Sequence, residues 1–348
     1  MRNVIITGSD GFLGSHLVDF LLKKGFFIFA FIKPNSSMHN LAHYLDSSKK
    51  YQDIENEAYL DKKIKIPTNE KHLKILEVDI NDFELVEQLI YKIKPNIIYH
   101  FAAQPYVIPS WENPRSTIQT NIIGTINIFE PIKKYNIDCR VVLAGSSAAY
   151  GTTTKEIKRA LKESDPLKAI HPYGISKIAT ELMARQYYLN FNIDIVNLRF
   201  FNQTGPRKTN DACSDFIQKV AQIELDMVAP IIEVGNLDPY RDIMGIKDTI
   251  QAIWLGAEKG RSGETYNVCS NRKIQIRKVL EISLSFSSKK IKVIENKPEK
   301  LRKTDEDIIL GDNSNIREEL NFEIQQSVEE FLKEMFNYWI NYYKNYKK

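Results

Sequence analysis

A tyrosine and a lysine four residues apart form the pattern best suited to proton transfer in this sequence. The stretch "HPYGISK" places Tyr173 and Lys177 on one face of a helix. A lysine ammonium is expected to lower the pKa of a nearby phenol, so Tyr173 would serve as an acid or a base near neutrality. Ser146 ends the apolar run in "RVVLAGSS" and offers a hydroxyl to a reacting oxygen. The three side chains predict an enzyme that moves a proton at a substrate oxygen.

A glycine-rich turn near the start of the chain predicts a dinucleotide site. In "GSDGFLG", Gly8, Gly11 and Gly14 separate the apolar run 3–7 from an amphipathic stretch at 15–25. Small residues let the backbone approach a pyrophosphate, and the helix that follows offers free N–H groups and a positive dipole end.

The residues after the second apolar run indicate which dinucleotide binds. An acid there would hold the ribose 2′-hydroxyl of NAD, but this sequence has Lys33 followed by Asn35, Ser36 and Ser37, with no acid nearby. A lysine with hydroxyls suits a 2′-phosphate, which favours NADP(H) and leaves NAD(H) possible. Asp79 is expected either to accept from the adenine amino group or to cap the helix that begins near Asp82.

The elements that position these residues alternate between apolar runs and helical stretches. Strands are predicted at 3–7, 26–32, 73–80, 96–103 and 140–147, and helices at 15–25, 83–93 and 114–135. This alternation predicts an α/β fold with a Rossmann-type doubly wound parallel sheet. Residues 1–200 are expected to form the dinucleotide-binding domain, with a polar insertion at 38–72. Residues 201–348 are expected to form mainly a smaller interleaved substrate lobe, with some segments returning to the first domain.

Composition limits the partners. The 348 residues carry a net charge of +4, too weak to indicate nucleic acid, and the longest apolar run, at 26–32, is too short to cross a bilayer. Three widely spaced cysteines and six histidines without ligand spacing predict neither disulfides nor a metal site. A cytoplasmic protein that binds an anionic small molecule fits this pattern.

Further motifs carry a family resemblance over nearly the whole chain. With the stretches above, "HFAAQ", "TNIIGTINIFE", "RFFNQTGP", "VGNLDPYRD" and "ETYNVCS" resemble the extended short-chain dehydrogenase/reductases that act on nucleotide sugars, in particular the GDP-sugar branch. The resemblance implies a catalytic triad of Ser146, Tyr173 and Lys177. The cofactor residues that it implies are Gly8, Gly11, Phe12, Leu13, Gly14, Lys33, Asp79, Ile80, Ala102, Ala103, Gln104, Tyr173 and Lys177.

The resemblance also implies contacts to a GDP-linked sugar. Its residues would be Ser147, Asn202, Arg241 and Arg302. Arginine suits bidentate phosphate contact, although Arg241 is followed by Asp242 and the two side chains could instead form an internal ion pair. Arg199 and His171 are assigned structural roles.

One position departs from the dehydratases of this family, which carry Thr-(Asp/Ser)-Glu before Tyr-Gly. Alignment on Tyr150-Gly151 puts Ala148 in the place of the glutamate, and a methyl group cannot move a proton. Glu163 or Asp165 from the following loop could stand in for it. The lead hypothesis is therefore NAD(P)H-dependent reduction of the C4 keto group of a GDP-4-keto-6-deoxy hexose or heptose.

Three other functions stay open. They are a GDP-mannose-type or GDP-heptose 4,6-dehydratase with an altered base, a nucleotide-sugar C4 epimerase that uses the same triad, and a non-catalytic dinucleotide-binding protein. The resemblance further implies a homodimer that pairs through two helices per subunit, for which 114–135 and 177–190 are the candidates. Their apolar faces could also pack only on the sheet.

Overall fold

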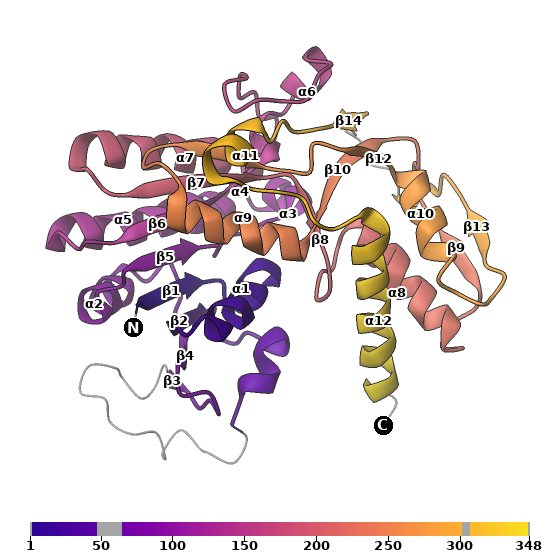
Figure 1. Ribbon diagram of the computed structural model, residues 1–348, viewed down its shortest axis with the longest axis horizontal. Helices are drawn as coiled ribbons and strands as arrows, with labels where there is room; N and C mark the ends of the chain where they lie inside the picture. Colours follow the sequence, from indigo (N-terminus) through magenta and orange to yellow (C-terminus); the bar gives the residue numbers. More distant parts are fainter. Residues whose placement is uncertain (1, 47–64, 301–306, 347–348) are drawn as a thin grey trace. The chain divides into compact units, whose positions relative to one another are not determined.

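The computed structural model describes residues 2–46, 65–300 and 307–346 (Figure 1). The chain divides into two compact units, each made of several segments. Unit 1 comprises residues 1–151, 167–199 and 252–266, and unit 2 comprises residues 152–166, 200–251 and 267–348. The prediction placed the main boundary at residue 200, with some later segments returning to the first domain. In the structure, residues 252–266 lie in unit 1, and residues 152–166, which precede that boundary, lie in unit 2.

Unit 1 is built on a sheet with the strand order β11-β7-β6-β5-β1-β2-β4-β3. Its strands are β1 (Asn3–Thr7), β2 (Phe27–Ile32), β3 (Lys65–Ile66), β4 (Leu73–Glu77), β5 (Ile97–His100), β6 (Arg140–Ser146), β7 (Ile195–Phe200) and β11 (Thr265–Val268). β1 pairs in parallel with both β2 and β5, so the strand order reverses there. The strands β2–β4 and β5–β6 are also parallel, and the edge strand β3 is antiparallel. This topology confirms the predicted doubly wound Rossmann-type fold.

Helices connect these strands and bury their apolar faces. They are α1 (Phe12–Lys23), α2 (Phe83–Ile93), α3 (Val107–Glu112), α4 (Pro114–Ile118), α5 (Gly124–Tyr135), α7 (Pro172–Phe191) and α9 (Ile246–Lys259), the last of which spans both units. In α2, residues Val86, Leu89, Ile90 and Ile93 recur at helical spacing and are all buried. They share one core with residues of β5, β6 and α5.

Two strands end earlier than the sequence predicts. The predictions 73–80 and 96–103 extend past β4 and β5, which stop at Glu77 and His100. Beyond β5, the amides of Phe101 and Ala102 donate to Thr7 Oγ1, at 3.1 and 3.0 Å, so a side chain satisfies them. These trailing residues are loops at the carboxyl edge of the sheet, where ligands of such folds bind.

The predicted helix at 114–135 is interrupted. Between α4 and α5 lies η4 (Gln119–Ile123), one turn of π-helix. Such turns are rare and concentrate at functional sites. In the predicted insertion 38–72, the structure describes the short 3₁₀ helix η1 (His39–Tyr44) and strand β3, while residues 47–64 lie outside the described residues.

Unit 2 has its own small sheets and its own core. Strand β10 (Tyr240–Gly245) pairs with β8 (Asn202–Thr204), β12 (Lys273–Gln275) and β14 (Ile308–Ile309), and β9 (Ile231–Glu233) pairs with β13 (Lys292–Ile294). Its helices are α6 (Thr153–Glu156), α8 (Ala212–Glu224), α10 (Ile276–Leu284), α11 (Ser314–Leu320) and α12 (Val328–Tyr346), with the 3₁₀ turn η6 (Pro298–Lys300). Val220, Val279 and Leu332, from α8, α10 and α12, are fully buried together. Among the helices in the described ranges, none has the length and apolarity needed to cross a membrane.

Candidate active site

The glycine turn joins β1 to α1 with two close backbone approaches. Gly8 has a φ of +67°, and a Cβ there would meet the Ala102 backbone N at 3.0 Å. At Gly14 a Cβ would lie 2.3 Å from the Gly8 carbonyl oxygen, so only glycine lets the helix pack this closely on the turn. Gly11 is the N-cap of α1, and no side chain caps the helix. The first helical residues, Phe12 and Leu13, therefore present backbone N–H groups where the pyrophosphate is predicted.

The loop after β2 has no acid of its own, but two carboxylates from other segments contact it. Ser36 Oγ donates to Asp10 Oδ2 within the glycine turn, and the Asn35 amide lies 3.4 Å from Glu77 Oε1 on β4. Both acids are distant in sequence and reach the loop because β1, β2 and β4 are adjacent strands. Lys33 is exposed at the start of this loop.

The predicted cofactor residues after β4 and β5 lie along the same edge of the sheet. Asp79 Oδ1 accepts hydrogen bonds from the Asn81 amide and side chain at 2.9 and 3.0 Å. The predicted alternative that Asp79 caps the next helix is wrong, because Asp82 Oδ1 accepts from the Leu85 amide and caps α2. Ile80 packs against Gly124, where a Cβ would approach its Cγ2 to 2.9 Å.

Ala102, Ala103 and Gln104 continue this edge after β5. The amide of Ala102 is bound to Thr7. Gln104 turns back on the chain, and its side chain donates to the Tyr106 carbonyl at 2.9 Å and to Thr117 Oγ1 at 3.1 Å. The three residues follow β5 after Phe101, and β5 pairs with β1, whose end carries the glycine turn.

The structure brings Ser146, Tyr173 and Lys177 together. Ser146 ends β6, whereas Tyr173 and Lys177 lie one turn apart in α7. Ser146 and Tyr173 share a side-chain hydrogen bond. Lys177 Nζ lies 5.9 Å from the centroid of the Tyr173 ring and donates to the Ala144 carbonyl at 2.7 Å. A phenol, a hydroxyl and an ammonium therefore converge at the end of β6.

Burial sets the protonation of these groups. Desolvation raises the pKa of Tyr173, and the Ser146 hydrogen bond opposes this only in part. The pKa is thus raised rather than lowered as the sequence predicted, and the phenol is neutral at pH 7. Desolvation lowers the pKa of Lys177 to about 8, which leaves the ammonium as the main form at neutrality.

The start of α7 has a local cause. His171 is its N-cap, and its Nδ1 accepts from the Gly174 amide at 2.9 Å, while Pro172 occupies the first turn. Burial lowers the pKa of His171, which keeps the imidazole neutral and able to accept this bond. The assigned structural role of His171 agrees with this position.

A polar network that was not predicted from the sequence links the end of β1, next to the glycine turn, to α7. Asn121, in the π turn η4, donates to Ser176 Oγ at 2.9 Å, and Ser176 Oγ donates to the Tyr173 carbonyl at 2.7 Å. Thr125 Oγ1 donates to the Asn121 carbonyl, and both Thr125 and Thr7 bind the His100 ring, at 3.0 and 2.9 Å. A signal existed, because these polar residues interrupt apolar stretches, but only the fold shows what they bind.

His100 is held neutral in this network, because burial lowers its pKa to about 3. Thr7 Oγ1 already accepts two backbone amides, so its proton is free to go to His100 Nδ1. The ring then donates from Nε2 to Thr125. The hydrogen bonds thus select one tautomer.

The place of the missing carboxylate is an apolar turn. Ala148 and Ala149 lie in the 3₁₀ turn η5 (Ser147–Ala149), which follows Ser146. Ser147 begins this turn in unit 1, and its carbonyl accepts from the Tyr150 amide.

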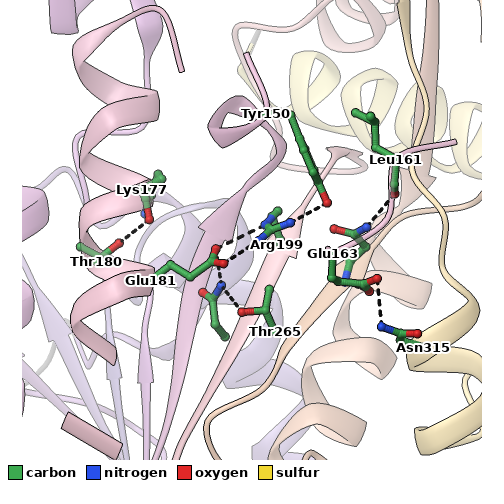
Figure 2. Close-up of polar contacts among 11 residues, drawn as sticks. Tyr150, Leu161, Glu163, Lys177, Thr180, Glu181, Arg199, Thr265 and Asn315 are labelled. Carbon is green, nitrogen blue, oxygen red and sulfur yellow. Dashed lines mark hydrogen bonds and ion pairs between the residues drawn. The ribbon is translucent and has the colours of Figure 1, made fainter. Parts of the chain in front are cut away.

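The two carboxylates weighed as replacements are bound within unit 2. Glu163 accepts from the Asn267 amide at 2.8 Å. It also accepts from Asn315 Nδ2 at 3.0 Å (Figure 2). Asp165 forms a bidentate pair with Arg159, both bonds measuring 2.8 Å, which lowers the pKa of its carboxyl. Because both carboxylates accept structural hydrogen bonds, nothing supports the hypothesis that either one replaces the dehydratase glutamate.

Two predicted substrate residues line a cavity in unit 2. The cavity, of about 990 Å³, is lined by α8, β9 and β10, and includes Asn202, Arg241, Lys219 and Lys300. Arg241 is 8% exposed, and its Nη1 donates to the Tyr240 carbonyl at 2.9 Å. Arg302, the fourth predicted substrate residue, lies outside the described residues.

Asp242, the next residue of β10, binds a different set of groups from Arg241. Its carboxylate accepts from the amides of Ser270, Asn271 and Gly311 and from Ser270 Oγ, and burial raises its pKa to about 6. These bonds tie β10 to the segments after β11 and β14. They give Asp242 a structural role, whereas Arg241 faces the cavity.

A doubly wound sheet with a glycine turn after its first strand and a Ser-Tyr-Lys set at the end of β6 defines an extended short-chain dehydrogenase/reductase. Residues 5–335 match the family model described as GDP-mannose 4,6 dehydratase, so the chain belongs to this family of nucleotide-sugar enzymes. It is an NAD(P)-dependent enzyme that modifies a nucleotide sugar.

Individual relatives differ in their reactions. The chain is 24% identical over 225 residues to the GDP-6-deoxy-D-mannose reductase of Pseudomonas aeruginosa, covering 64% of this chain and 73% of the relative. It is 28% identical to the UDP-glucuronate 4-epimerase of Thermodesulfobacterium geofontis, covering 94% and 93%. The solved structure of RMD from Pseudomonas aeruginosa complexed with NADPH is similar with a TM-score of 0.79 at 19% identity, covering 98% of this chain and 100% of that one; this likeness shows the fold.

Proposed function

We propose that the protein reduces the C4 keto group of a GDP-4-keto-6-deoxy sugar with NADPH. The observation that carries the proposal is the convergence of Ser146, Tyr173 and Lys177 beside an apolar turn with Ala148 in the place of the dehydratase glutamate. Ketone reduction needs one proton donor at the oxygen, whereas loss of water needs a further acid or base near the sugar. The relationship to a GDP-6-deoxy-D-mannose reductase supports the same choice.

Each side chain has one task in this reaction. NADPH, when bound, supplies the hydride that adds to C4. The Ser146 hydroxyl hydrogen-bonds the ketone oxygen and stabilises the negative charge that develops there. Tyr173, a neutral phenol at pH 7, gives its proton to that oxygen, so the C4 ketone becomes a secondary alcohol. The Lys177 ammonium stabilises the phenolate that remains until solvent reprotonates it.

The dinucleotide is proposed to bind along the carboxyl edge of the unit 1 sheet. Gly8, Gly11 and Gly14 admit the pyrophosphate to the N-terminus of α1, and Asp79, Ile80, Ala102, Ala103 and Gln104 flank it. Exposed Lys33 supports NADPH over NADH, because it can bind a 2′-phosphate, and NADPH is bound to the similar solved structure. Asp10 and Glu77 near this loop keep NADH as the alternative.

The GDP moiety is proposed to bind in the unit 2 cavity. Arg241, Lys219 and Lys300 offer positive charge to a diphosphate, and Asn202 offers an amide. Ser147 is proposed to contact the sugar, and Arg302 to contact the nucleotide.

The proposed function is tested by two incubations of the purified protein. With GDP-4-keto-6-deoxymannose and NADPH, we expect stoichiometric loss of the reduced cofactor and a product two mass units heavier. With GDP-mannose and NADP⁺, we expect no loss of water. Loss of water in the second incubation would contradict the proposal in favour of the dehydratase. If neither sugar reacts, GDP-4-keto-6-deoxy-heptoses are the next substrates.

A C4 epimerase is the second candidate, because the same triad serves it and a 28% identical relative is a UDP-glucuronate 4-epimerase. An epimerase would convert a nucleotide sugar into its C4 epimer without net consumption of cofactor. Conversion of GDP-mannose or UDP-glucuronate to an isomer of equal mass would identify the protein as an epimerase.

A homodimer is proposed from an apolar surface on α3, α4 and α7. Ile175, Leu182 and Leu189 recur every seven residues along α7 and are 52, 60 and 65% exposed, and Trp111 of α3 is 59% exposed. Contiguous exposed apolar side chains on this scale mark interaction sites. We expect Leu182→Arg to convert a dimer into a monomer in size-exclusion chromatography with light scattering. Tyr91→Arg, on α2, is the control and should leave the mass unchanged; a monomeric wild type would contradict the proposal.

A further inference from the structure

Arg199 contacts both Tyr150 and Glu181, which belong to two parts of the proposed active site (Figure 2). It lies on β7, and its side chain is 1% exposed. The guanidinium donates to the Glu181 carboxylate through Nε and Nη2, at 3.3 and 2.5 Å, and to Tyr150 Oη through Nη1, at 2.5 Å. The proposed reaction assigns no task to this buried cation.

The Glu181 branch holds the catalytic helix. Glu181 lies in α7, one turn after Lys177 and two turns after Tyr173. Its carboxylate also accepts from Asn197 Nδ2 at 2.9 Å, so two side chains of β7 bind it. Charge-assisted bonds of this kind are short and directional, and they set the position of α7 along β7.

The Tyr150 branch holds the strand end. The Tyr150 ring is fully buried and lies 4.7 Å from the Arg199 guanidinium carbon, measured to the ring centroid. Its amide donates to the Ser147 carbonyl at 3.0 Å and so closes the turn that directly follows Ser146. An anchored Tyr150 therefore fixes where β6 ends and where the Ser146 hydroxyl stands.

We propose that Arg199 and Tyr150 are positioning residues that set the distance between Ser146 and the Tyr173–Lys177 face of α7. The guanidinium is one rigid plane, and its two edges bind the strand end and the helix. A displacement of about 1 Å of a reacting group can cost roughly 10²-fold in rate, so such a clamp affects turnover without touching the substrate. The catalytic part of this proposal rests on the proposed function, and the structural part does not.

The structural part is tested with Tyr150→Phe, which removes the hydroxyl and keeps the ring. We expect the amides of Ala148 and Tyr150 to exchange with deuterium about 10- to 100-fold faster, because one hydrogen bond to a charged group is lost. Amides of α7 should not change, because the Arg199–Glu181 bonds persist. Tyr187→Phe is the matched control, since Tyr187 is also buried and its hydroxyl binds the Glu130 carboxylate. Unchanged exchange in Tyr150→Phe, or equal acceleration in the control, would overturn the proposal.

The catalytic part is tested with a double-mutant cycle between Tyr150→Phe and Ser146→Ala. Tyr150→Phe alone should lower kcat about 10-fold and leave the cofactor Kd unchanged. In the Ser146→Ala protein it should cause no further loss, because Tyr150 acts through Ser146. If kcat of the double variant instead falls by the product of the two single effects, Tyr150→Phe causes a general structural defect. That result would overturn the positioning role. If the wild type does not reduce the keto sugar, the proposed function fails. The hydrogen-exchange experiment still tests whether Arg199 and Tyr150 hold the end of β6 in place.

Discussion

Tyr173→Phe is expected to lower kcat by roughly 10²–10⁴-fold, the usual contribution of a positioned general acid. The phenol, hydrogen-bonded to Ser146 and next to Lys177, is the proposed proton donor. Burial raises its pKa, so it holds its proton at pH 7 until charge develops on the substrate oxygen. Phenylalanine keeps the ring and its packing but has no proton to give.

Two measurements separate this chemical loss from a binding defect. Oxidation of NADPH gives kcat, and a fluorescence titration gives the Kd of the cofactor, which should change less than threefold or so because binding rests mainly on the glycine turn. Tyr91→Phe, at an exposed position of α2, serves as the control with unchanged kcat. A Tyr173→Phe protein that retains more than a third or so of its kcat would contradict the assigned role.

Glu181→Ala is expected to lower the free energy of unfolding by about 3–5 kcal/mol, the cost of breaking a buried ion pair on one side. The Arg199 side chain is 1% exposed, so its charge would lose its carboxylate partner at a site with little access to water. Asn197 Nδ2 loses an acceptor in the same step. The effect comes from the uncompensated charge rather than from the attraction itself.

Urea unfolding followed by circular dichroism measures this loss. The control is Glu281→Ala, which removes an exposed partner of Lys278 and should stay within about 0.5 kcal/mol of the wild type. Combining Glu181→Leu with Arg199→Met should recover part of the stability, because no charge is then left buried. A loss below about 1 kcal/mol in Glu181→Ala would show that the cluster is more hydrated than its burial indicates.

The elements that a local pattern encodes were predictable. The apolar run 3–7 coincides with β1, and the amphipathic stretch 83–93 coincides with α2. A strand buried on both faces and a helix buried on one face each leave a periodic trace in the sequence. The glycine turn and the Tyr173–Lys177 pair were equally accessible, because their geometry is fixed within a few residues.

Protonation and loop contacts were not accessible in the same way. The pKa of Tyr173 depends on how much of the phenol is desolvated, and this raises the pKa by more than the Ser146 hydrogen bond lowers it. Asp10 and Glu77 reach the loop after β2 only because three strands are adjacent. Glu163 and Asp165 follow the active-site strand in sequence, yet both are bound as acceptors within unit 2.

The sequence by itself determined the fold class, the position of the glycine turn and the side chains proposed for catalysis, because each depends on the spacing of neighbouring residues. Only the tertiary structure decided what surrounds them. Three features join segments that lie far apart along the chain. They are the π turn that carries Asn121, the neutral His100, and Arg199 with its bonds to Tyr150 and Glu181. Such contacts follow from the strand order and from the burial of polar groups that must find partners, and neither leaves a periodic trace in the sequence.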